Sequence, residues 1–168
     1  MVSLDALFID AVQRLWVFIC ANPFLGAATA FLLYNKLKPK VPFPESGGTV
    51  VGVHTEDAWR KALAANAKDG RLLIVDFYAT WCPPCRSAAP VFGTLSMNYA
   101  NVDFVKVDVD ELTAVAKAQA ISAMPTFKVF HNGKCVQSLQ GFDAAKIVQQ
   151  LEAAGARKGA PPTAAKTD

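Results

Sequence analysis

Two cysteines separated by two prolines are the residues of this 168-residue chain with the clearest chemical potential. Residues 75–86 have the sequence VDFYATWCPPCR, so Cys82 and Cys85 follow a run of apolar, strand-forming residues and a tryptophan. A cysteine pair with this spacing, between a strand and a helix, is typical of a thiol–disulfide centre. Cys82 would lie at the N-terminus of the helix, where unpaired N–H groups and the helix dipole favour a thiolate.

A zinc site is the alternative for a single C-x-x-C motif. Structural zinc is held by four ligands, and the sequence contains neither a second C-x-x-C nor a histidine pair at a suitable spacing. His54 and His131 are isolated, and Cys20 and Cys135 are distant from the motif in the sequence. We therefore expect no metal. Cys135 is expected to be a passive thiol, with a regulatory role as the alternative.

The elements that must position the cysteines alternate between strand and helix from residue 49 onward. Strands are expected at 49–53, 71–77, 102–107, 126–131 and 135–139, and helices at 56–68, 83–99, 111–118 and 143–154. Helices between strands require crossovers and a mostly parallel sheet, whereas Asn132-Gly133 predicts an antiparallel hairpin at one edge. The order therefore predicts a three-layer α/β domain, with a central mixed sheet and helices on both faces.

These motifs, in this order, resemble thioredoxin over roughly residues 50–153. The resemblance rests on VDFYATWCPPC, FVKVDVDE, AMPTFKVFHNG and Gly141. The Pro-Pro between the cysteines is similar to the form in h-type plant thioredoxins and in tryparedoxins, and it departs from the commoner Gly-Pro. The resemblance implies the thioredoxin fold and a protein-disulfide reductase with no bound cofactor. Its oxidised cysteine pair would receive electrons from NADPH through a thioredoxin reductase, or from another dithiol donor.

The resemblance also implies roles for individual residues. Cys82 would be the nucleophile and Cys85 the thiol that resolves the mixed disulfide. Asp76, within an otherwise apolar strand, would accept the proton of Cys85, and its burial should raise its pKa. Lys106 matches the family lysine near that carboxylate. A strand-end aspartate that caps a neighbouring group and a solvated strand lysine remain the alternatives for Asp76 and Lys106.

A substrate groove is expected beside the cysteine pair. Pro125 resembles the family's cis-proline, which would leave the backbone of Met124 free to pair with an extended substrate segment. The side chains and backbone groups expected to form the docking surface and its rim belong to Trp81, Pro83, Pro84, Met124, Pro125 and Gly141.

The N-terminal region predicts a membrane anchor. Residues 15–34 are twenty residues without a charge, about the number that a helix needs to cross the hydrocarbon core. Lys36, Lys38 and Lys40 follow, and by the positive-inside rule they place the downstream domain in the cytosol. The expected organisation is a hydrophobic anchor at 1–37, a Pro/Gly linker at 38–48, a thioredoxin domain at 49–155 and a disordered tail at 156–168.

Other interpretations of the N-terminal region remain open. They are a cleaved signal peptide, a mitochondrial presequence, and two shorter helices near 3–21 and 23–37 that divide at Asn22-Pro23 and lie on the membrane or form a re-entrant hairpin. The net charge of +3 is concentrated in the lysines after the apolar run, so it gives no indication of nucleic-acid binding.

Two alternative functions also remain open. A lumenal location would favour a disulfide oxidase or isomerase, and a soluble cytosolic location is a further possibility. A thioredoxin-like domain could also bind partners without turnover, in which case Cys85 would be dispensable. The function expected from the motifs is the reduction of protein disulfides by a membrane-tethered enzyme on the cytosolic side.

Overall fold

The chain divides into two compact units. The computed structural model describes residues 10, 12–14, 17–18, 21–37 and 42–159. The first unit comprises Met1–Pro42 and the second Phe43–Asp168. The cysteine pair belongs to the second unit.

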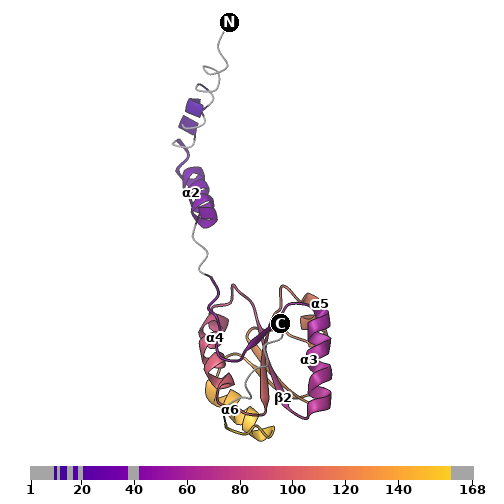
Figure 1. Ribbon diagram of the computed structural model, residues 1–168. Coiled ribbons are helices and arrows are strands. Elements are labelled where there is room, and N and C mark those ends of the chain that lie inside the picture. The colour runs from indigo at the N-terminus through magenta and orange to yellow at the C-terminus, as the bar shows by residue number, and fades with distance from the viewer. Residues whose placement is uncertain (1–9, 11, 15–16, 19–20, 38–41, 160–168) are drawn as a thin grey trace. The chain divides into compact units, whose positions relative to one another are not determined.

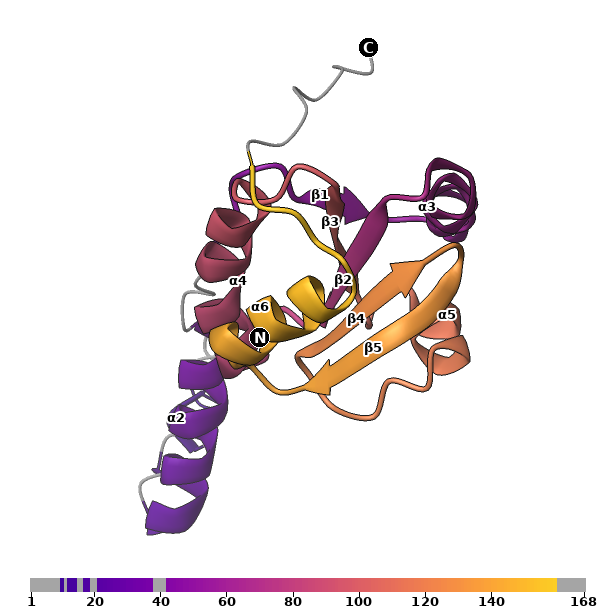
Figure 2. The same ribbon diagram turned by 90° about the horizontal axis from the view of Figure 1, so that it is seen from below.

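A five-stranded mixed sheet forms the centre of the second unit, in the strand order β1-β3-β2-β4-β5 (Figure 2). The strands are β1 (Val51–Val53), β2 (Leu72–Tyr78), β3 (Val102–Asp108), β4 (Thr126–His131) and β5 (Lys134–Gln140). β1, β3 and β2 are parallel, whereas β4 is antiparallel to both of its neighbours. The predicted mixed sheet with an antiparallel edge is confirmed.

Helices cover both faces of this sheet. Figures 1 and 2 show α4 (Pro83–Ser96) and α6 (Ala144–Ala153) on one face, and α3 (Glu56–Asp69) and α5 (Thr113–Ala118) on the other. Alternate residues of β2 enter the two resulting cores, and the whole strand is buried. A strand covered on both faces must be apolar throughout, which explains its almost uninterrupted apolar sequence. The predicted three-layer architecture is confirmed.

Local signals in the sequence determine where several elements begin and end. Thr55 caps α3 by accepting a hydrogen bond from the backbone N–H of Ala58 at 3.1 Å, and Gly70 ends the helix in the left-handed region at φ 63°. Asn132 and Gly133 both have positive φ, at 52° and 74°, as the tight hairpin turn between β4 and β5 requires.

The C-terminal boundary differs from the expected one. Residues 156–159, expected in a disordered tail, instead pair with the segment after α4. The N–H of Ala100 donates to the carbonyl of Arg157 and that of Gly159 to the carbonyl of Asn98, both at 3.0 Å. α4 ends at Ser96 rather than at the expected residue 99, and the paired segment follows it. Residues 160–168 lie outside the described residues.

The N-terminal boundary of the folded unit also differs, because residues 43–48 of the expected linker belong to it. Thr49 donates two hydrogen bonds to Ser96 of α4, from its N–H to Oγ at 2.8 Å and from its hydroxyl to the carbonyl at 3.2 Å. Gly93 of α4 meets the backbone of Ser46 so closely that a Cβ on this glycine would overlap the Ser46 carbonyl. We call residues 43–49 the strap.

The described part of the first unit contains α2 (Pro23–Leu37). Residues 15–16 and 19–20 of the expected membrane span lie outside the described residues, and no helix among the described residues has the length and apolar character needed to cross a bilayer. The carbonyl of Asn22 accepts the first helical hydrogen bond from Gly26 at 3.0 Å. α2 thus begins where the two-helix interpretation predicts.

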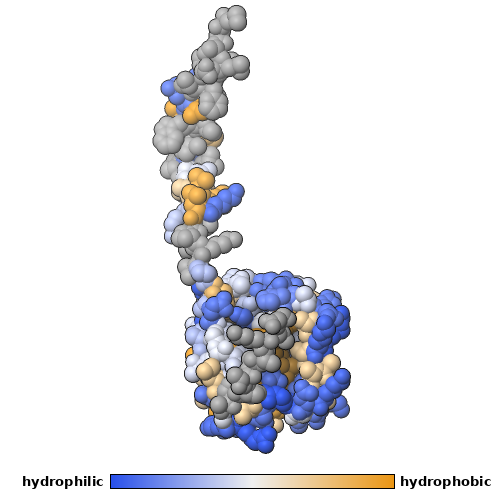
Figure 3. Space-filling model, viewed as in Figure 1, coloured by the Kyte–Doolittle hydropathy of each residue, from blue (hydrophilic) through white to orange (hydrophobic). Residues whose placement is uncertain are grey.

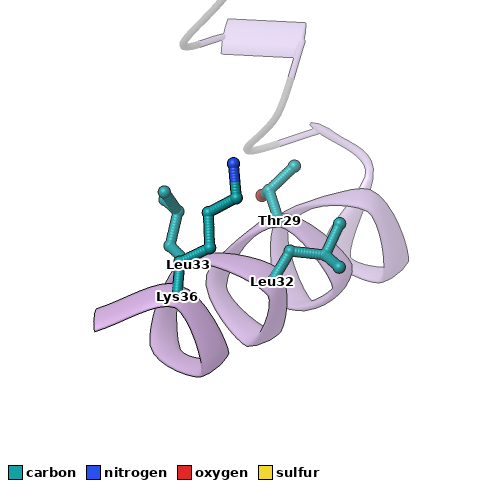
Figure 4. Close-up of a pocket in the computed structure, with 4 residues that line it drawn as sticks. All are labelled: Thr29, Leu32, Leu33 and Lys36. Atoms are coloured by element: carbon teal, nitrogen blue, oxygen red, sulfur yellow. The ribbon is translucent and has the colours of Figure 1, made fainter. Parts of the chain in front are cut away.

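Most described side chains of α2 are exposed, and many of them are apolar (Figure 3). Large apolar residues with more than half of their surface exposed are Phe24, Phe31, Leu32, Leu33, Tyr34 and Leu37. Figure 4 shows Thr29, Leu32, Leu33 and Lys36 projecting from consecutive turns of the helix. Lys36 lies in the last turn of the helix.

Candidate active site

Cys82 and Cys85 form a disulfide at the start of α4, with their Cα atoms 5.3 Å apart. Cys82 is the N-cap residue, and its Sγ accepts a hydrogen bond from the backbone N–H of Cys85 at 3.3 Å. Pro83 and Pro84 are exposed and occupy the first helical positions, where the missing N–H groups are not needed by the helix. Cys85 is fully buried, whereas 3% of Cys82 is exposed. The N–H that now bonds Cys82 Sγ would stabilise a thiolate there.

Asp76 is a buried carboxyl group in the central strand, with 1% of its surface exposed. Its Oδ1 has no hydrogen-bond partner among the described residues. Burial raises the pKa of Asp76 to about 7, and the ammonium group of Lys106 acts in the opposite direction. Asp76 and Lys106 are register partners on β2 and β3, so their side chains project from the same face of the sheet. The structure thus brings together the carboxyl and the lysine that the sequence paired.

The turn before β4 contains a cis peptide bond between Met124 and Pro125, as the resemblance implies. Met124 packs, half buried, against the cluster of side chains that contains both cysteines. Gly141 donates its N–H to the Pro125 carbonyl at 2.8 Å, and its φ is 78°. A Cβ at Gly141 would have no atom within 4 Å, so the glycine supplies backbone freedom rather than space.

Trp81 precedes the disulfide and is 64% exposed. Its indole Nε1 donates a hydrogen bond to Oδ2 of Asp110 at 2.7 Å. The N–H of Asp110 bonds Oδ1 of Asp108 at 2.9 Å, which orders the loop after β3. The hydrogen bond from Trp81 to Asp110 orients the exposed indole ring next to the cysteine pair. The sequence does not predict the contact with Asp110, because the two residues are 29 positions apart.

The remaining cysteine and the histidines have separate surroundings. Cys135 is exposed on β5 and its Sγ donates to the carbonyl of Gln137 at 3.3 Å. Nδ1 of His54 lies 2.8 Å from Oε2 of Glu111. Within the described ranges, no three His, Cys, Asp or Glu side chains gather in a way that could hold a metal ion.

Comparison with known proteins agrees with this geometry. The family model described as thioredoxin matches residues 50–153. Thioredoxin H3 of Arabidopsis thaliana is 42% identical over 105 residues, which are 62% of this chain and 89% of that protein. An H-type thioredoxin of Chlamydomonas reinhardtii is 45% identical over 102 residues, which are 60% of this chain and 90% of that protein.

Solved structures show the same relationship. The crystal structure of a thioredoxin h from Nicotiana alata superimposes with a TM-score of 0.62 at 36% identity, covering 64% of this chain and 93% of that one. The region that the family model matches, residues 50–153, begins directly after the strap. It includes the disulfide, Asp76, Lys106 and the cis-proline turn. This chain therefore belongs to the thioredoxin family and is a thiol–disulfide oxidoreductase.

Proposed function

We propose that the chain reduces protein disulfides with Cys82 as its nucleophile and Cys85 as its resolving thiol. The observation that carries this assignment is the position of Cys82 at the N-cap of α4, where its sulfur accepts the N–H of Cys85. Helix N-termini stabilise thiolates, and the thiolate is the attacking species in disulfide exchange. Cys85 is fully buried and lies within bonding distance of Cys82, as a resolving thiol must.

The reaction begins from the reduced dithiol. The Cys82 thiolate attacks one sulfur of the substrate disulfide, which forms a mixed disulfide and releases the first substrate thiolate. Cys85 then loses its proton and attacks Cys82 Sγ, which closes the Cys82–Cys85 disulfide and releases the second substrate thiolate. Two electrons pass from the dithiol to the substrate disulfide, and the two protons of the dithiol account for the two product thiols.

Asp76 is the group we assign to accept the proton of Cys85. It is buried, one of its oxygens is unpartnered within the described region, and its pKa of about 7 lets it exchange a proton near neutral pH. Lys106 limits the rise of that pKa. Trp81, Met124, Pro125, Gly141 and the exposed prolines would form the surface on which an extended substrate segment docks.

The dithiol must be regenerated after each turnover. We propose that electrons reach the Cys82–Cys85 disulfide from NADPH through a thioredoxin reductase, without a cofactor bound to this chain. The test follows NADPH oxidation by an NADPH-dependent thioredoxin reductase in the presence of the full chain and insulin. We expect insulin reduction and NADPH oxidation that both depend on the chain, with Cys135→Ser unchanged. A chain that transfers electrons to insulin neither from the reductase nor from dithiothreitol would contradict the function.

We further propose that the N-terminal unit attaches the enzyme to a membrane, with the catalytic domain on the cytosolic side. The exposed apolar residues of α2 and the lysines that follow them support this location. Burial of apolar side chains at the boundary between lipid headgroups and acyl chains is favourable, and nearby lysines are attracted to anionic headgroups.

Vesicle flotation tests the attachment. We expect the full chain to float with vesicles that contain phosphatidylcholine and phosphatidylserine, and the double variant Leu32→Glu/Leu33→Glu to stay at the bottom of the gradient. Met97→Glu, which changes an exposed apolar residue of the second unit, is the matched control and should float. Equal flotation of the double variant and the unchanged chain would argue against α2 as the attachment.

A further inference from the structure

The strap lies outside residues 50–153, which the thioredoxin family model matches, yet it contacts the candidate active site. Its first residue, Phe43, has its ring 4.7 Å from the ring of Tyr78, centroid to centroid. The guanidinium carbon of Arg86, the residue after Cys85, lies 5.8 Å from the Phe43 centroid. Phe43 packs against the cluster formed by Tyr78, Ala79 and the two cysteines. The strap is therefore part of the wall around the disulfide.

The strap also supplies a charge. Oε2 of Glu45 lies 3.6 Å from Nζ of Lys106. The side chain of Lys106 is 15% exposed and that of Glu45 is 92% exposed, so Glu45 meets the lysine from the solvent side. Nζ of Lys106 also lies 6.0 Å from the centroid of Tyr78. The ammonium group that lowers the pKa of the buried Asp76 is thus also paired with a carboxylate of the strap.

The position of the strap is defined by close packing on α4. The hydrogen bonds from Thr49 to Ser96 hold its last residue, and the glycine at 93 allows the Ser46 backbone to approach the helix. A Cβ at Gly48 would likewise overlap the Gly93 carbonyl and Ser96 Oγ. The strap is therefore packed tightly on α4 rather than being a loose linker. This packing places Phe43 against the cysteine cluster and Glu45 beside Lys106.

We propose that the strap is a positioning element of the dithiol reaction, in which Glu45 holds and partly neutralises the Lys106 ammonium and so sets the proton affinity of Asp76. The expected effect on catalysis rests on the proposed role of Asp76 as the proton acceptor of Cys85. The effect of Glu45 and Lys106 on the pKa of Asp76 does not depend on that role, and it can be measured without any reaction.

The direction of the effect follows from the surrounding charges. Lys106 on β3 lowers the pKa of Asp76, against the larger effect of burial. The other register partner of Asp76 is Phe127 of β4, which carries no charge, and the thiols at the start of α4 do not titrate while they form a disulfide. A carboxylate on Lys106 weakens the action of its positive charge on Asp76. Removal of the Glu45 charge should therefore lower the Asp76 pKa.

Tyr78 lies on the same face of β2 as Asp76, two residues further on. Burial raises the pKa of Tyr78 to about 12, and the carboxylates of Asp108, Asp76, Glu111 and Glu45 add to that rise. The phenol is neutral throughout the range in which Asp76 titrates, so it does not contribute a competing charge. These carboxylates surround the phenol, and Glu45 is the one that the strap brings.

The test is the titration of Asp76 in the full-length oxidised chain, followed by the carboxyl ¹³C resonance of labelled aspartate. We expect Glu45→Gln to lower the Asp76 midpoint by about 0.1–0.7 pH unit, with the interaction energy of an exposed ion pair as the upper limit of the change. Lys106→Met should raise the midpoint. In the double variant, the effect of Glu45→Gln should disappear, because Glu45 acts through the lysine.

Glu152→Gln is the matched control, since Glu152 is also ion-paired with a lysine, Lys158, at 2.9 Å. It should leave the Asp76 midpoint unchanged. A midpoint that Glu45→Gln does not move, or that it moves equally in the Lys106→Met background, would overturn the proposal. Both variants change exposed carboxylates, so each is expected to fold.

The catalytic consequence is measured separately. The rate of mixed-disulfide resolution as a function of pH should show the same displacement in Glu45→Gln as the ¹³C titration. If the ¹³C midpoint moves while the resolution rate keeps its pH profile, the strap acts on Asp76 as proposed, and the proton-acceptor role of Asp76 fails instead. The two failures are therefore distinguishable.

Discussion

Replacing Cys85 with serine is expected to turn the chain from a catalyst into a trap for its substrate. Cys82 keeps its position at the helix N-cap and still attacks a disulfide, but a hydroxyl does not resolve the mixed disulfide. Insulin reduction should fall by roughly a hundredfold or more, and a covalent adduct should accumulate. Non-reducing gel electrophoresis of the variant with insulin, beside the NADPH assay, measures both effects.

Two other cysteine variants are the controls for this experiment. Cys82→Ser should lose turnover without forming an adduct, because the remaining Cys85 is fully buried. Cys135→Ser should retain turnover, since Cys135 is exposed on β5 and its sulfur bonds a backbone carbonyl of its own strand. Unchanged insulin reduction in Cys85→Ser would contradict the role of Cys85 as the resolving thiol. An adduct in Cys82→Ser would assign the nucleophile to another cysteine.

Replacing Asp76 with asparagine is expected to stabilise the oxidised chain at alkaline pH. Burial raises the pKa of Asp76 from 3.8 to about 7, so the folded chain carries the cost of a buried carboxylate above pH 7. A pKa difference of about three units corresponds to about 4 kcal/mol, and we expect a gain of up to about 4 kcal/mol in the free energy of unfolding. Lys106 keeps its contact with Glu45 in the variant. Urea unfolding at pH 8 measures the gain.

The pH dependence of that gain gives a second check. Above pH 7 the carboxyl is ionised in both folded and unfolded chains, and the difference from the variant is largest. As the pH falls from 7 to about 4, the folded chain holds a proton that the unfolded chain releases, so the unchanged protein gains stability relative to the variant. The difference should be small below pH 4. A difference that is independent of pH, or that Asp69→Asn reproduces, would contradict the assigned pKa.

Patterns of a few neighbouring residues were sufficient to predict the fold. Asn132-Gly133 predicted a hairpin because both of its positions need positive φ. The C-x-x-C motif between a strand and a helix predicted the disulfide for the same reason: the residues involved are close in the sequence. Local rules of this kind need no knowledge of distant contacts.

The boundaries of the folded unit required the tertiary structure. Residues 43–48 contain a proline and two glycines, which indicate a linker when taken alone. They are ordered because Gly93, some 45 residues later, leaves room for the Ser46 backbone. The hydroxyl of Ser96 also accepts a hydrogen bond from the N–H of Thr49 and donates one to the carbonyl of Gly93. Residues 156–159 are ordered for a similar reason, since their partners are backbone groups after α4.

The sequence by itself determined the chemistry of this protein: a dithiol at a helix start, a carboxyl within an apolar strand and a proline before the hairpin. Only the tertiary structure decided what surrounds that chemistry, because the indole of Trp81 meets Asp110 and the carboxylate of Glu45 meets Lys106 across 29 and 61 positions of the chain. Such contacts depend on strand order and on packing against α4, which no local pattern encodes.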